Sequence, residues 1–200
     1  MAEIKMVTIE EDILNFYKGI YFGKTQDKLD AAVKRAYLDF CRTIETSGIR
    51  EKDWPHIKKR LFKDFKEMIE SISDIKSQEE YDSWHQEICE KLCNSLAGKW
   101  LELTPGQAQK WLNMTMKYLY ILGDDTGKNC FEFSHIPVDR IILEAAKRID
   151  VYPHTKKCWS KWEYGEYIDF QKRLRETIKG EFPSRWEFKT WNEAARGIGQ

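Results

Sequence analysis

The stretch T-P-G-Q-A-Q-K-W-L-N-M-T-M-K-Y-L-Y-I-L, residues 104–122, decides the fold class. Thr104 and Gln107 have the spacing of a capping box, and Pro105 stands at the first helical position, where its missing N–H is not needed. Apolar residues then recur at helical spacing: Ala108, Trp111, Leu112, Thr115, Leu119 and Leu122, with Met114, Tyr118 and Ile121 beside them. The pattern predicts a helix over residues 107–122 that is apolar around much of its circumference and therefore central.

Helix-start signals and apolar stripes recur along the rest of the chain. Further capping boxes are predicted at Thr8/Glu11, Ser77/Glu80, Ser160/Glu163 and Ser184/Glu187. Stripes at helical spacing fall in residues 29–44, 54–72, 81–96, 141–149 and 162–178, while residues 123–129 read as a polar loop. Residues 131–133 alternate like a strand but are too short for a sheet. We therefore predict an all-α, single compact domain of about eight helices over residues 1–200.

Composition limits the classes of function. The 33 Lys and Arg residues balance 33 Asp and Glu residues, which argues against a generic polyanion binder with a clear basic excess. Residues 1–17 carry early acidic residues and no long apolar run, so they do not predict a signal peptide. No segment approaches the roughly 20 apolar residues that span a bilayer. Five cysteines, an odd number without secretory features, predict reduced thiols. We expect a cytoplasmic protein with no membrane partner.

Two segments carry a pattern with chemical meaning. Residues 103–110 read L-T-P-G-Q-A-Q-K, and residues 136–149 read I-P-V-D-R-I-I-L-E-A-A-K-R-I. Together they resemble the helix-hairpin-helix DNA glycosylases, in which a hairpin of the type L-P-G-V-G-x-K is followed, one helix later, by P-V-D and another helix. The resemblance matches Pro105 and Gly106 to the hairpin's Pro-Gly and Ala108 to its second glycine. It places Lys110 at the catalytic lysine and Asp139 at the carboxylate of P-V-D.

The resemblance implies a protein that contacts DNA or a nucleotide, either a glycosylase/lyase or an inactive relative. The hairpin amides, at Gly106, Gln107 and Ala108, would hold a phosphate at a helix N-terminus. Lys110 would attack C1′ of a flipped nucleotide and form a Schiff base, while Asp139 stabilises the positive charge that develops on the sugar. The candidates for stacking on the base are Trp100 and Trp111.

The same residues are also compatible with a purely structural role. Residues 104–107 can simply cap a helix, Asp139 can be the N-cap acceptor of the next one, and Lys110 can be solvated. The alternative function is then a non-enzymatic helical accessory protein, of the kind that phages or mobile elements encode, that engages a protein partner.

A metal site is the other candidate, because His85, Cys89 and Cys93 follow one another at intervals of four residues on one helical face. Three such ligands on a straight helix span about 12 Å, which is too far for one ion. Small cysteines beside a core stripe are typical packing residues. We therefore predict no metal, and no sequence motif predicts a cofactor.

Overall fold

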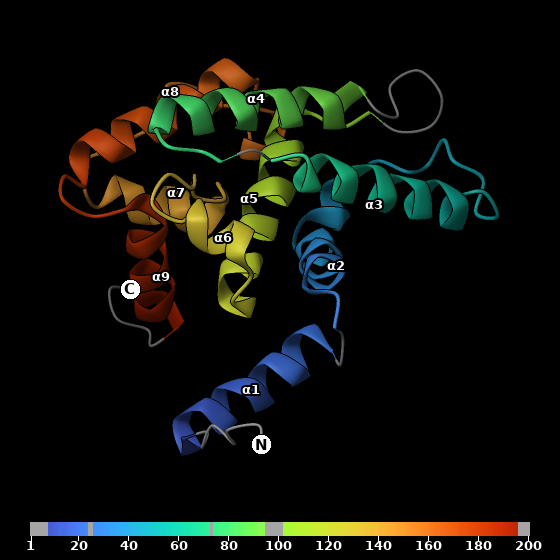
Figure 1. The fold of residues 1–200 in the computed structure, drawn as a ribbon. Coiled ribbons are helices and arrows are strands. Elements are labelled where there is room, and N and C mark those ends of the chain that lie inside the picture. The colour runs from blue at the N-terminus through green and yellow to red at the C-terminus, as the bar shows by residue number, and fades with distance from the viewer. Residues whose placement is uncertain (1–7, 24–25, 73, 95–101, 196–200) are drawn as a thin grey trace.

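The computed structural model describes residues 8–23, 26–72, 74–94 and 102–195. Within these ranges the chain forms nine α-helices, two short 3-10 helices and no strand, which confirms the predicted all-α class with about eight helices (Figure 1). In chain order the elements are α1 Ile9–Phe22, α2 Lys28–Phe40, η1 Cys41–Thr43, α3 Trp54–Glu70, α4 Gln78–Asn94, α5 Pro105–Leu122, α6 Asp125–Asn129, α7 Arg140–Lys147, η2 Trp159–Lys161, α8 Tyr164–Thr177 and α9 Pro183–Ala195.

Helix α5 is the central element, as its sequence predicts. In Figure 1 it runs between α2 and α3 on one side and the α6, α7 and α9 helices on the other. Thirteen of its 18 residues are buried. The predicted capping box is present: Thr104 Oγ1 accepts from the Gln107 amide at 3.1 Å, and the Thr104 amide donates to Gln107 Oε1 at 3.0 Å. The helix ends at Gly123, whose φ of 70° is the left-handed conformation that glycine adopts without strain.

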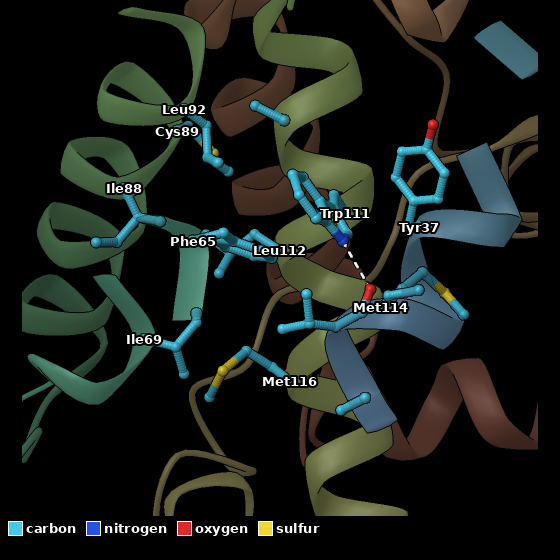
Figure 2. Close-up of a cluster of buried hydrophobic side chains, with 14 of the residues drawn as sticks. Tyr37, Phe65, Ile69, Ile88, Cys89, Leu92, Trp111, Leu112, Met114 and Met116 are labelled. Carbon is cyan, nitrogen blue, oxygen red and sulfur yellow. Dashed lines mark hydrogen bonds between the residues drawn. The ribbon is translucent and has the colours of Figure 1, made fainter. Parts of the chain in front are cut away.

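One core cluster lies between α2, α3, α4 and α5, and Figure 2 shows how its side chains converge on α5. Trp111 is completely buried there, and its ring centroid is 4.3 Å from that of Phe65. Its indole Nε1 donates to the Val33 carbonyl at 3.0 Å, so the one polar atom of the side chain is satisfied. This cluster fixes the position of α5 in the fold.

A second core cluster lies behind the opposite side of α5. Segment 136–138, α7, the residue that follows η2, and α8 contribute side chains that are nearly or completely buried: Ile136, Val138, Ile142, Trp162 and Phe170. Because this cluster holds the start of α7 against α5, it brings two segments 29 residues apart in sequence into contact. The candidate site depends on this contact.

Four local predictions were wrong, each for an identifiable reason. Residues 123–129 are not an open loop, because Asp124 caps the short helix α6 through the Thr126 amide. Residues 131–133 form a turn after α6 and not a strand. Helix α8 is capped by the Glu163/Glu166 pair and not by Ser160/Glu163. Ser184 lies inside α9, where its hydroxyl donates to the Ser134 carbonyl at 3.2 Å.

Candidate functional site

A cleft of about 760 Å³ opens where α1, α2, α5 and α7 meet. Aromatic residues line it from four elements, namely Tyr17 and Tyr21 on α1, Tyr118 on α5, Trp159 in η2 and Trp191 on α9. Its lining also includes five cationic side chains and two carboxylates. Clefts of roughly 300–1,000 Å³ with apolar walls and a few polar groups are typical of ligand sites. This cleft is therefore the candidate functional site.

Lys110 and Asp139, the two residues proposed for catalysis, meet at the floor of the cleft. Lys110 Nζ lies 2.7 Å from Asp139 Oδ2, and the two side chains are 5% and 17% exposed. The other carboxylate oxygen of Asp139 accepts from the Ile142 amide at 2.9 Å and so caps α7. The structure thus brings the pair together, and Asp139 also has the N-cap role that the structural interpretation predicts. Lys110, by contrast, is buried and not solvated.

The hairpin residues Pro105, Gly106, Gln107 and Ala108 do not present free amides to the cleft. The Gly106 amide donates to the Trp162 carbonyl at 3.0 Å, and the Gln107 and Ala108 amides donate to Thr104. A Cβ atom at position 106 would overlap the Trp159 carbonyl oxygen, so the turn at η2 is packed directly on this glycine. In this conformation these three amides already have acceptors within the chain, and their contact with a phosphate stays a prediction.

Trp111 does not face the cleft either. Its side chain has no exposed surface and is packed against the core aromatics, so it is not placed to stack on a base. Trp100, the other stacking candidate, lies outside the described residues. The aromatic surfaces of the cleft come instead from Trp159, Trp191 and the tyrosines, which are distant in sequence from the hairpin.

Lys117, which lies about two turns after Lys110 on α5, forms a second ion pair in the cleft. Its Nζ lies 2.7 Å from Oε1 of Glu187, a residue of α9 that is 1% exposed. Burial raises the pKa of the Glu187 carboxyl above its ordinary value, and the Lys117 ammonium opposes this shift. The same ammonium lies 4.8 Å from the ring centroid of Phe188. Two of the five cations are therefore neutralised by carboxylates.

The other three cations, Lys18, Arg42 and Arg140, have no hydrogen bond or ion pair to any part of the chain that the structure describes. They come from three different elements: α1, η1 and the first residue of α7. The remaining carboxylate, Asp39, accepts a hydrogen bond from the Tyr118 hydroxyl at 2.6 Å. The free charge around the cleft is consequently positive, although the whole chain is neutral.

Sequence reasoning missed a polar network on the buried side of α5. Asn113 Nδ2 donates to Tyr167 Oη at 2.8 Å, and Asn113 Oδ1 lies 2.9 Å from His85 Nε2. Tyr167 Oη lies 2.8 Å from His135 Nδ1, whose Nε2 is 2.7 Å from Asp82 Oδ1. The only sequence signal was the recurrence of Gln109, Asn113 and Lys117 at four-residue spacing, a polar stripe on a helix that is otherwise apolar.

The network contains two buried histidines. Burial lowers the pKa of both His85 and His135 below the ordinary value, so both rings are neutral at pH 7. Among the described residues, no three His, Cys, Asp or Glu side chains gather in a way that could hold a metal ion.

Nor does any helix in that part of the chain have the length and apolar character that a membrane crossing requires.

Comparison with known proteins does not add an assignment. No family model matches the sequence, and no match was found among curated proteins or among solved structures. Any functional conclusion therefore depends on the chemistry of the cleft itself.

Proposed function

We propose that this chain binds an anionic, base-containing ligand, DNA or a nucleotide, in the cleft between α1, α2, α5 and α7. The observation that carries the proposal is the set of three unpaired cations, Lys18, Arg42 and Arg140, around aromatic walls. Cations at such positions bind phosphate oxygens, and aromatic rings offer stacking surfaces for bases. A local basic site in a neutral chain fits selective binding better than general attraction to polyanions.

The Lys110–Asp139 pair supports a binding role more directly than a lyase role. Schiff-base formation needs a neutral amine, whose lone pair attacks C1′ and displaces the base or, at an abasic site, leads to loss of water. An ammonium held 2.7 Å from a carboxylate has no lone pair to offer. Within the proposed function, the pair shapes the floor of the cleft and Lys110 becomes a nucleophile only if ligand binding separates it from Asp139.

Fluorescence anisotropy with a labelled single-stranded oligonucleotide and with a labelled nucleotide tests the proposal at low and high salt. We expect binding to weaken as salt rises, and Arg42→Gln/Arg140→Gln to weaken it at least tenfold, since each lost phosphate contact removes charge-assisted hydrogen bonds. The matched control is Arg60→Gln/Lys63→Gln on α3, which removes the same charge outside the cleft. Equal losses in both double variants would show that the cleft is not the binding site.

Borohydride trapping separates binding from lyase chemistry. The wild-type chain and Lys110→Gln are incubated with duplex DNA that contains an abasic site, and a Schiff base is reduced to a stable adduct. Binding without an adduct is the expected result for the geometry observed. An adduct that disappears in Lys110→Gln would establish the glycosylase/lyase activity that the sequence resemblance implies.

A second candidate function, engagement of a protein partner, has one specific observation in its favour. Seven of the eleven large apolar residues that are exposed in the described chain lie on α1. A contiguous apolar surface of this kind is typical of an interaction site. It requires no nucleic acid and no chemistry at Lys110.

A further inference from the structure

Helix α1 has two apolar sides, and only one of them packs against other residues that the structure describes. On the inner side the Tyr21 hydroxyl lies 2.9 Å from that of Tyr118, and Phe22 packs edge-on against the Tyr118 ring. The outer side carries an apolar stripe of four residues, which we call the outer stripe: Ile9, Ile13, Phe16 and Ile20, which are 67%, 50%, 64% and 66% exposed. None of the 14 residues of α1 is buried.

The outer stripe has the residue spacing of a helix–helix interface. Its residues are separated by four, three and four positions, the spacing of the a and d positions in paired helices. A helix of this length is marginal on its own in water, even with the Thr8/Glu11 capping box that α1 has. In Figure 1 α1 extends away from the other helices, so the outer stripe is accessible to another chain.

We propose that the outer stripe is covered by the same stripe of a second copy of this chain, with the two α1 helices antiparallel. The spacing of four, three and four reads the same in both directions. An axis midway between residues 14 and 15 therefore places Ile9 opposite Ile20 of the second copy and Ile13 opposite Phe16 of the second copy. This self-complementarity is what a two-fold interface requires.

Charge favours the antiparallel arrangement over the parallel one. The acidic residues of α1 are all in its first turn, Glu10, Glu11 and Asp12, and its one cation is Lys18. A parallel pair would place two acidic turns side by side. The antiparallel pair separates the two acidic turns.

The residues beside the outer stripe also fit an antiparallel neighbour. In an antiparallel pair the same flank of each helix faces the other, so Glu10 lies near Tyr17 of the second copy on one flank, where a phenol hydroxyl can donate to a carboxylate. On the other flank Asp12 lies near Gly19 of the second copy, which has no atom within 4 Å of a Cβ position, so the two backbones can approach closely there. No residue on either flank opposes a like charge.

The size of the contact sets its strength. Helix α1 is about 21 Å long at 1.5 Å per residue, and its roughly four turns bury less than the roughly 800 Å² per partner of a standard stable interface. We therefore expect a weak dimer whose population rises with concentration. This inference goes beyond the cleft, because only Ile20 of the four stripe residues also lines it.

Sedimentation velocity over a wide range of concentration tests the proposal on the full chain. We expect a monomer–dimer equilibrium in the wild type. In Ile13→Glu, which buries a charge in the interface, we expect dimerisation to be weakened at least tenfold. Asn15→Glu adds the same charge to α1 outside the outer stripe and should leave the equilibrium unchanged. A wild-type chain that stays monomeric throughout would overturn the proposal and leave the stripe to a different protein. So would a dimer that persists in Ile13→Glu, or one lost equally in both variants.

Cysteine cross-linking then tests the orientation. Ile9→Cys and Ile20→Cys are prepared separately on a Cys158→Ser background, because Cys158 is the exposed native thiol among the described residues. After mixing and mild oxidation, the antiparallel pair predicts disulfides mainly between position 9 of one copy and position 20 of the other. Disulfides mainly between identical positions would overturn the antiparallel arrangement.

Discussion

Helices α5 and α1 are both apolar on much of their surface, yet α5 is buried within the chain and α1 is not. Thirteen of the 18 residues of α5 are buried, whereas none of the 14 residues of α1 is. Both begin with a complete capping box, so their local signals are equivalent. The difference shows that an apolar helical pattern predicts that a surface will be covered, but not whether the same chain will cover it.

The largest difference between the two helices should appear when an aromatic side chain is removed from each. Trp111→Ala on α5 should lower the free energy of unfolding by about 3–5 kcal/mol, because it leaves a cavity in the core. Phe16→Ala on α1 should change it by less than about 0.5 kcal/mol in dilute protein, because the side chain is 64% exposed. Urea denaturation of both variants measures the two values. Similar losses would mean that α1 is as much part of the core as α5.

A smaller loss is expected where η2 packs on the start of α5. Gly106→Ala should lower the free energy of unfolding by about 1–3 kcal/mol, because the new methyl group overlaps the Trp159 carbonyl and the turn must shift. The control is Gly165→Ala in α8, where a Cβ atom meets nothing within 4 Å. That substitution should leave stability unchanged or raise it by up to about 1 kcal/mol, because alanine favours helix. A neutral Gly106→Ala would contradict the close contact between η2 and α5.

The smallest effect is the dependence of stability on pH, which comes from the buried polar side of α5. The pKa values of His85 and His135 are lowered in the folded chain, so the unfolded chain binds more protons below about pH 6.5. Stability should therefore fall as the pH is lowered, by at most about 1 kcal/mol per histidine between pH 6.5 and 5.5. Urea denaturation at these pH values measures the slope, and His85→Gln should reduce it. The control is His56→Gln, because His56 is exposed. If neither variant changes the slope, the buried network is not the source of the pH dependence.

The sequence predicted the elements well where local chemistry decides them. The capping boxes at Thr8 and Thr104 and the stripe of α5 need only residues close in the chain, and the structure has all three. The boxes expected at Ser160 and Ser184 failed because other groups took those positions: Glu163 caps α8, and the Ser184 hydroxyl bonds to Ser134. A cap depends on where the helix begins, and tertiary contacts move that point by a few residues.

The candidate site was only partly predictable. The sequence singled out Lys110 and Asp139, and the structure places them 2.7 Å apart. Their role in catalysis and the role of the hairpin in nucleic-acid contact stay predictions. The cations that surround the cleft, Arg42 and Arg140 among them, carry no local motif, because they come together from η1 and α7 only through packing.

What the sequence by itself determined is the all-α class, the central position of residues 107–122 and the neutrality of the chain, because each depends on composition or on spacing within one helix. Only the tertiary structure decided which polar residues of α5 are buried, which cations remain unpaired and which apolar stripe stays exposed. These properties depend on distances between residues far apart in the chain, and helical periodicity does not encode such distances. The contrast between α5 and α1 has the same cause: helices distant in the sequence pack around α5, whereas the outer stripe of α1 stays exposed in the part of the chain that the structure describes.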